Sequence, residues 1–160
     1  MVRIDLKQTW NGQIVKTQCK KVSNKSAYET GLIVEGYAKE LAARRYGYLA
    51  ASFNTQSISE GTELDNPSKY AKEKVPINHD VKTFRKISKP NIESETLVGT
   101  AVDYSWYPEF GTIYQDAQPA LRPALEMAKG EVLEIVKINS KKYFLNYLIE
   151  HEQYLQSRGK

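Results

Sequence analysis

The stretch that decides the fold is YPEFGTIYQDAQPALRPAL, residues 107–125. An acidic residue, an aromatic residue and a Gly-Thr pair end an extended run at residues 109–112, and a polar loop follows. Gln118 and Pro119 then introduce a segment in which apolar residues recur at helical spacing. Proline is favoured in the first turn of a helix, where its missing N–H costs nothing. The pattern therefore predicts a strand, a tight exit, a loop and a helix.

Six residues of this stretch form a predicted structural corner and candidate interface: Glu109, Phe110, Gly111, Thr112, Pro119 and Arg122. Glu109 is expected to form an ion pair with Arg122, or to contact backbone N–H groups at the following turn. Gly111 is expected to supply a backbone conformation that a side chain would resist. Pro119 would fix the start of the helix.

A long helix is predicted upstream, at residues 13–45, which contain no proline. Small and apolar residues recur there at steps of three or four, and the small ones would let a sheet or another helix come close. Cys19 lies on this stripe and is expected to be a small buried residue. The Ser-Asn-Lys-Ser run at residues 23–26 could bend the helix or cap a new one. The stripe consists of Val15, Cys19, Val22, Ala27, Gly31, Val34, Ala38 and Leu41.

Two stretches with alternating apolar and polar side chains predict paired strands. Gly47 is expected to end the long helix, and residues 49–59 alternate after it. Residues 97–107 alternate again, until Pro108 ends the ladder because it cannot donate a hydrogen bond. Since the two stretches flank one long excursion, we expect them to pair antiparallel, as hairpin arms do. A third, short strand is predicted at residues 2–6.

Residues 60–96 form the least regular part of the chain, rich in lysine and poor in large apolar residues. A structureless loop of this length is uncommon in a compact domain unless it is functional or flexible. We expect a flexible excursion that becomes ordered against a neighbouring molecule. Its candidate assembly residues are Lys69, Tyr70, Lys82, Phe84 and Arg85.

The helix that begins near Pro119 is predicted to reach residue 137. Asn139-Ser140 then offers either a cap for a separate helix or a polar spot within one long helix, and helical spacing resumes at residues 144–155. The predicted fold class is α+β. A long N-terminal helix and a C-terminal helix pack on a small antiparallel sheet that carries a long hairpin excursion.

Composition narrows the class of protein. A chain of 160 residues suits a single domain. Its one cysteine cannot form an intrachain disulfide, so a secreted, disulfide-stapled design is not indicated. No apolar run approaches the roughly 18 residues that span a bilayer, so we expect a soluble protein without a membrane partner. The 11 tyrosines suit either a small core or an interface that is wet at its edge.

Patterns for catalysis, cofactors and metals are scarce. No glycine-rich phosphate-binding motif is present. Two histidines, His79 and His151, are too few for a histidine metal site. A hydrolase would have to be built on Glu109, whose neighbouring carboxylates in the sequence are Asp103 and Asp116. The expectation is therefore a protein without enzymatic activity, cofactor or metal.

A band of lysines marks the first half of the long helix: Lys16, Lys20, Lys21 and Lys25. Such a band contacts phosphate or an acidic partner, or is simply a solvated helix face. Together with the lysines of residues 69–89, it makes a small basic nucleic-acid-binding module the alternative function.

Two motifs together resemble the small head–tail joining or tail-completion proteins of long-tailed bacteriophages, the gene-product-ten-like family. The first is GYLAASF, residues 47–53, after a helix that ends in AKEL, residues 38–41. The second is YSWYPEFGT, residues 104–112, followed by QPALRPAL, residues 118–125. Members typically have a long helix, a glycine followed by leucine and serine, a Val-Glu-Phe-Gly-Thr segment and a Gln-Pro-Phe-Leu-Arg-Pro-Ala helix start.

The order and spacing of these motifs agree, and the resemblance covers most of the chain. Pro108 departs from the usual apolar residue before the glutamate, and Ala120 departs from the usual phenylalanine. The excursion is longer than expected. The resemblance implies a single domain over residues 1–160, with a family-like core at 1–137 and a C-terminal helical extension at 138–160.

The resemblance also implies a function. The protein would be a non-enzymatic virion component that forms a ring, expected to be hexameric, at the neck between portal complex and tail tube. Its partners would be copies of itself and other phage neck or tail proteins. DNA would pass through the ring without specific binding. The protein would be made in the cytoplasm of the bacterial host, and its ring would need heterologous self-contacts that close.

Overall fold

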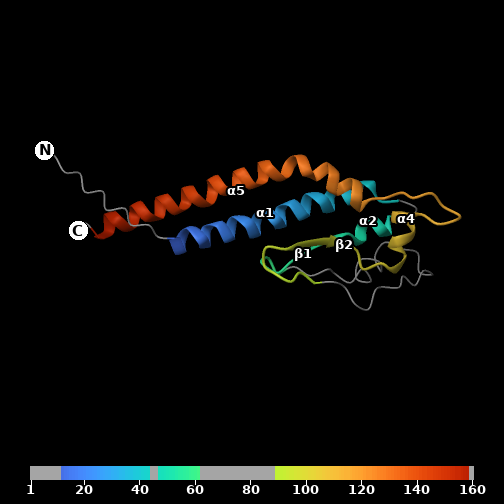
Figure 1. Ribbon diagram of the computed structural model, residues 1–160, viewed down its shortest axis with the longest axis horizontal. Coiled ribbons are helices and arrows are strands. Elements are labelled where there is room, and N and C mark those ends of the chain that lie inside the picture. Colours follow the sequence, from blue (N-terminus) through green and yellow to red (C-terminus); the bar gives the residue numbers. More distant parts are fainter. Residues whose placement is uncertain (1–11, 44–46, 62–88, 159–160) are drawn as a thin grey trace.

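The structure is a computed structural model that describes residues 12–43, 47–61 and 89–158 (Figure 1). The expected α+β class is confirmed, because two long helices accompany a small antiparallel sheet. In chain order the elements are α1 (Gly12–Leu41), α2 (Tyr48–Ser52), β1 (Asn54–Ser57), β2 (Thr96–Gly99), the 3-10 helix η1 (Asp103–Ser105), α4 (Trp106–Phe110) and α5 (Leu121–Arg158).

Several sequence predictions lie outside the described residues. They are the strand at residues 2–6, His79, and the candidate assembly residues Lys69, Tyr70, Lys82, Phe84 and Arg85.

The two long helices lie side by side and antiparallel, with the sheet against α1 (Figure 1). At 1.5 Å per residue, the 30 residues of α1 are about 45 Å long and the 38 residues of α5 about 57 Å. Within the described part of the chain, no helix has both the length and the apolar character needed to cross a membrane.

Small side chains dominate the core between the helices. Ala120, just before α5, and Ala124 and Ala128 within it follow one another at helical spacing, and Ala38 of α1 and Ala42 just after it lie buried in the same cluster. Larger residues complete the cluster: Val34, Leu49 and Phe53. Because alanine adds only a methyl group beyond the backbone, the two helices can approach closely here.

The sheet consists of β1 and β2, whose predicted antiparallel pairing is confirmed, with Thr55 opposite Val98. It packs on α1 at Gly31, where the sequence predicted a close approach. A Cβ atom at Gly31 would lie 2.6 Å from Cγ2 of Thr96 and 2.8 Å from Cγ2 of Thr55. Glycine at this position therefore sets the distance between helix and sheet.

The first predicted strand, residues 49–59, is too long. Residues 48–52 form the short helix α2, and β1 covers only Asn54–Ser57. Gly47 has a positive φ of 70° and lies just before α2, whereas α1 already ends at Leu41. The Ala51 N–H donates to the Gly47 carbonyl at 3.0 Å. Two alanines in this turn favour helix, and a short alternating pattern does not exclude it.

The second predicted strand, residues 97–107, is also too long. β2 ends at Gly99, and the chain then forms η1 and α4. Pro108 lies within the first turn of α4, where its missing N–H costs no hydrogen bond. The prediction that it ends a strand ladder is therefore wrong, and the chain enters the corner from a short helix.

Both long helices are continuous. α1 runs through residues 23–26 without a break, and α5 runs through Asn139 and Ser140, so the single-helix alternative holds for the C-terminal half. Cys19 is exposed, contrary to expectation. It faces an open groove between the helices, so its place on the apolar stripe does not bury it.

Candidate functional site

The corner, defined here as residues 106–122, comprises α4, the following loop and the first residues of α5. It lies at one end of the molecule (Figure 1). The Gln118 N–H donates to the Pro108 carbonyl at 2.7 Å, which closes the loop at its base. The loop is therefore held at both ends by helices and across its base by a backbone hydrogen bond.

Glu109 caps the N-terminus of α5. Its Oε2 accepts hydrogen bonds from the N–H groups of Ala120 at 2.8 Å and Leu121 at 3.3 Å, and its Oε1 accepts one from Arg122 at 3.3 Å. The first N–H groups of a helix have no partner within the helix, and the helix dipole favours a negative charge there. The carboxylate thus joins α4 to α5.

This geometry decides between the two roles expected for Glu109. The contact with backbone N–H groups is confirmed. Among the residues that the structure describes, no ion pair joins Glu109 to the Arg122 side chain, which is exposed. Arg122 therefore contributes its backbone to the cap and leaves its guanidinium free for solvent or a partner.

Gly111 has the backbone conformation that the sequence predicted. Its φ is 76° and its ψ 176°, a region that only glycine adopts readily. A Cβ atom would lie 2.9 Å from the Ala117 nitrogen and 3.1 Å from the Gln115 oxygen. The Gly111 N–H donates to the Tyr107 carbonyl at 2.8 Å. Glycine therefore ends α4 and lets the loop fold back on itself.

The far end of the loop is a tight turn, here called the tip, at residues 112–116. The Thr112 N–H donates to the Gln115 carbonyl at 2.8 Å, and the Tyr114 N–H donates to the Thr112 hydroxyl at 3.2 Å. The turn presents Ile113 and Tyr114, which are 88% and 92% exposed. A turn held by these bonds presents two apolar side chains to solvent.

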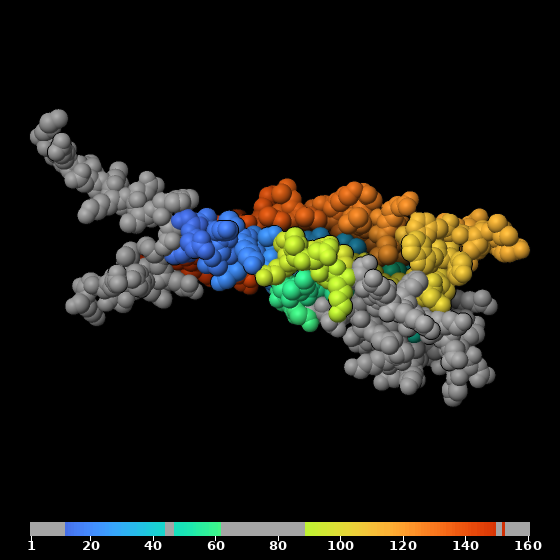
Figure 2. Space-filling model, turned by 60° about the horizontal axis from the view of Figure 1, so that its bottom comes forward, coloured from blue at the N-terminus to red at the C-terminus, as the bar shows by residue number. Residues whose placement is uncertain are grey.

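Aromatic side chains extend this exposed surface onto α4. Trp106, Tyr107 and Phe110 are each more than half exposed, and the rings of Trp106 and Phe110 stack with centroids 5.2 Å apart. The segment that carries them, yellow to light orange in Figure 2, projects from one end of the molecule. Contiguous exposed apolar surface is typical of interaction sites.

A hollow lies next to these aromatic side chains. It has a volume of about 520 Å³ and is lined mainly by apolar side chains, among them Leu49, Phe53, Pro108 and Leu125. The corner therefore offers both projecting and receiving apolar surface.

The sequence singled out the polar frame of the corner but missed its exposed apolar side chains. The available signal was the presence of Ile113 and Tyr114 in an otherwise polar loop, and the spacing of Trp106 and Phe110, which are four residues apart. The strand prediction for residues 97–107 concealed the second signal.

The corner's carboxylate is held by the backbone at the start of α5. Both oxygens of Glu109 accept backbone hydrogen bonds. No group of three histidine, cysteine or acidic residues that could hold a metal ion occurs within the described ranges. The arrangement is suited to binding by shape and apolar contact.

Two tyrosines lie behind the corner. The rings of Tyr48 and Tyr104 are 6.5 Å apart. Burial raises the pKa of Tyr104 to about 12, with smaller contributions from Tyr48 and Asp103, and burial also raises the pKa of Tyr48. Burial therefore favours the neutral form of both phenols.

The lysine band on α1 is partly engaged. Lys20 pairs with Glu93 at 2.9 Å, and Lys25 lies 3.6 Å from Glu60. The hydrogen bond from Lys20 lowers the pKa of Glu93. Lys16 and Lys21 are exposed and belong to no ion pair found among the described residues. Only half of the band remains available for an anionic partner.

Polar side chains also connect the two long helices. Asn139, buried on α5, donates to the Ser26 hydroxyl at 3.2 Å and to Glu29 Oε2 at 2.7 Å on α1. Nearer the corner, the Tyr37 hydroxyl donates to Glu131, which raises the pKa of Tyr37. A buried polar contact of this kind fixes the register of paired helices.

Comparison of the chain with protein-family models, with curated proteins and with solved structures gives no match.

Proposed function

We propose that this protein is a non-enzymatic structural subunit of a virion. It is a head–tail connector or tail-completion component of a long-tailed bacteriophage, and it assembles into a ring between the portal complex and the tail tube. The resemblance of residues 47–53 and 104–125 to the gene-product-ten-like family names this role. The observation that carries it is the capped corner, which holds apolar side chains out in solvent.

The energetic argument starts from the cost of such a surface. A subunit that works alone gains nothing from holding Ile113, Tyr114 and the α4 aromatics in water. Here the Glu109 cap and the Gly111 turn fix them in place. A preorganised surface loses little conformational entropy when it binds, so this arrangement favours a tight contact with a neighbour.

The groove between α1 and α5 adds a second apolar surface. Its lining on α5 includes Leu125 and Val136, which are 51% and 38% exposed. Two separate apolar surfaces on one chain are what a ring subunit needs, since it contacts a neighbour on each side.

The proposed partners are copies of this chain, in a hexameric ring, and other neck or tail proteins. DNA passes through the ring without specific contacts. The subunit is made in the host cytoplasm and ends in the virion neck. The alternative, a small nucleic-acid-binding module, has less support because Lys20 and Lys25 are engaged with Glu93 and Glu60.

Two experiments test the proposal. Sedimentation velocity and negative-stain microscopy of the concentrated protein are expected to reveal a closed ring. A protein that stays monomeric at every concentration, and also fails to bind purified tails, would contradict the proposal. In a DNA-retention assay, affinity that falls steeply with salt, by roughly 0.9 in logarithmic slope for each phosphate contact, would favour the alternative.

A further inference from the structure

The described part of the chain carries a projecting apolar feature and a receiving one at different places along α5. The projecting feature is the tip, residues 112–116. The receiving feature is a groove of about 710 Å³ where α1, α5 and β2 meet. Its lining is largely apolar and includes Val22 and Cys19 of α1 and Val132, Val136 and Phe144 of α5.

We propose that the tip of one copy of this chain docks in the α1–α5 groove of the next copy, at the groove end lined by Cys19, Val136 and Phe144. This inference rests on the proposed function, because it names the contact that joins neighbouring subunits of the ring. Ile113 and Tyr114 enter the groove, and Asp116 lies near its rim.

Charge complementarity selects this occupant. The tip, residues 112–116, contains Asp116 and no lysine or arginine. The helix segments at the chosen end of the groove have the opposite balance. Residues 12–28 contain four lysines and no acidic residue, and residues 135–149 contain three lysines and no acidic residue. An acidic tip therefore meets a basic groove end.

The charges concerned are available for a partner. Asp116 is exposed and takes part in no ion pair within the described part of the chain. The same holds for Lys16, Lys21, Lys141 and Lys142, which lie on the turns of α1 and α5 that form this groove end. Such flanking charges orient an approaching partner, while the apolar contact supplies most of the affinity.

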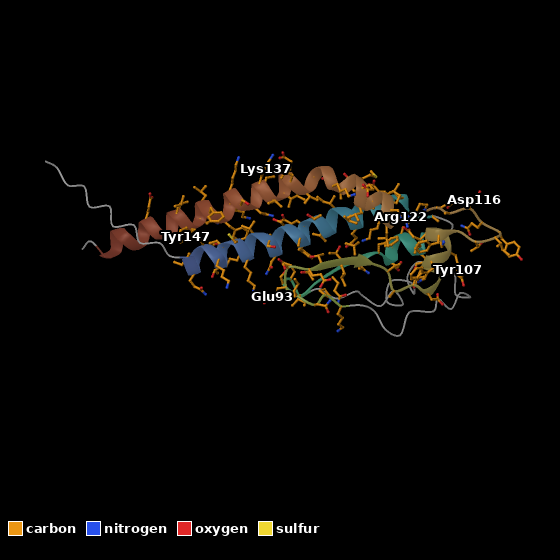
Figure 3. All side chains as sticks on the ribbon, viewed as in Figure 1. Glu93, Tyr107, Asp116, Arg122, Lys137 and Tyr147 are labelled. Carbon is orange, nitrogen blue, oxygen red and sulfur yellow. The ribbon has the colours of Figure 1, made fainter. Side chains whose placement is uncertain are left out.

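The tip cannot fill this end of the groove in its own chain. Ser140 lies about 27 Å along α5 from Arg122, at 1.5 Å per residue. Figure 3 places Asp116 at one end of the molecule, and Lys137 and Tyr147 progressively further along α5 toward the other. The contact must therefore join two copies. Because the two surfaces differ, the contact is heterologous and repeats around a ring or along an open chain.

The position of the chain's one cysteine makes the contact testable by cross-linking. Cys19 lines the groove and is exposed. In the full-length Tyr114→Cys variant, a tip seated in the groove brings the new thiol near Cys19 of the next copy. Mild oxidation with copper–phenanthroline is then expected to give intermolecular bonds between positions 19 and 114, identified by peptide mapping, and a ladder of oligomers on a non-reducing gel.

The matched control is Leu133→Cys, a substitution on α5 at a residue that is 62% exposed and does not line the groove. It reports random collisions with Cys19 and is expected to give no ladder. Bonds confined to 114–114 or 19–19 pairs, no bond at any concentration, or an equal ladder in the control would each overturn the proposal.

Substitutions that leave Cys19 alone give a second measurement. Ile113→Asp at the tip and Val136→Asp in the groove are each expected to weaken self-association about tenfold or more. Ile138→Asp, exposed on the same helix but outside the groove lining, is expected to change it less than about threefold. Equal effects of Val136→Asp and Ile138→Asp would contradict the contact.

The outcomes separate this contact from the proposed ring. Rings seen by microscopy without a 19–114 bond would leave the proposed function standing and overturn the contact. A 19–114 bond in open chains that never close would support the contact and remove the ring.

Discussion

At the corner, one carboxylate and one glycine fix the backbone, whereas along the seam between α1 and α5 the geometry depends on side chains. Glu109 joins three backbone N–H groups at the start of α5, and Gly111 turns the chain. The seam relies on small alanines and on buried Asn139. The difference indicates that the corner holds its exposed surface rigid. The contacts between α1 and α5 set the register of the two helices.

The largest expected effect comes from removing the corner's carboxylate. Glu109→Ala leaves three N–H groups without their partner and removes a favourable charge from a helix N-terminus. We expect a loss of about 2 kcal/mol in the free energy of unfolding, measured by urea denaturation. The control Glu126→Ala removes an exposed carboxylate that contacts only Lys129, and should cost less than about 0.5 kcal/mol. Equal losses would contradict the cap.

Adding a methyl group at the corner is expected to cost almost as much. In Gly111→Ala the new Cβ meets the Ala117 nitrogen, and φ stays positive, so a loss of about 2 kcal/mol is expected. Gly130→Ala is the matched control on α5, where the added Cβ meets no atom within 4 Å apart from its chain neighbours and the helix's own backbone. It should stabilise the protein by about 1 kcal/mol, because alanine favours helix. Thermal unfolding measures both, and a stabilising Gly111→Ala would refute the turn.

Substitutions at the seam between α1 and α5 are expected to lower the free energy of unfolding by less. Asn139→Ala removes two hydrogen bonds to α1, to Ser26 and Glu29, and we expect a loss of about 1 kcal/mol in urea denaturation. The exposed Asn146 on the same helix provides the control, since Asn146→Ala should change stability by only a few tenths of a kcal/mol. A larger loss than that of Glu109→Ala would reverse the ranking of the two regions.

The smallest effect is confined to alkaline pH. The pKa of Tyr104 is about 12 in the folded protein against an ordinary 10.0, so the folded state holds this proton more tightly. Stability should therefore be unaffected below pH 10 and should fall between pH 10 and 12. Tyr104→Phe should reduce this alkaline loss, measured by denaturation at each pH. An identical loss in Tyr104→Phe would contradict the assignment.

The sequence predicts the two long helices well because the apolar periodicity that indicates each helix extends over many residues. Periodicity over 30 residues of α1 and 38 of α5 exceeds what chance spacing produces, and the pairing of β1 with β2 follows from their position around one excursion. Where the five-residue helices α2 and α4 form, the sequence pattern predicts the ends of strands. Over so few residues, helical and extended patterns place apolar side chains alike.

The corner was predictable in its backbone but not in its surface. Gly111 has a local conformational requirement that the sequence reveals, whereas Pro119 lies two residues before α5 begins at Leu121 and not in its first turn. The choice between two partners for Glu109 depends on where α4 lies relative to α5. The exposure of Tyr114 depends on the whole fold around the tip. Asn139 and Ser26 are 113 residues apart in the chain, and only the helix register brings them together.

The most direct test of the central claim, that the corner is a contact surface in an assembly, follows the fluorescence of Trp106. Trp10→Phe leaves Trp106 as the one tryptophan, and its side chain is 58% exposed in the single chain. As concentration drives the protein from monomer to assembly, its emission should shift to shorter wavelength and acrylamide quenching should fall. An assembly in which Trp106 is quenched as readily as in the monomer would contradict the claim.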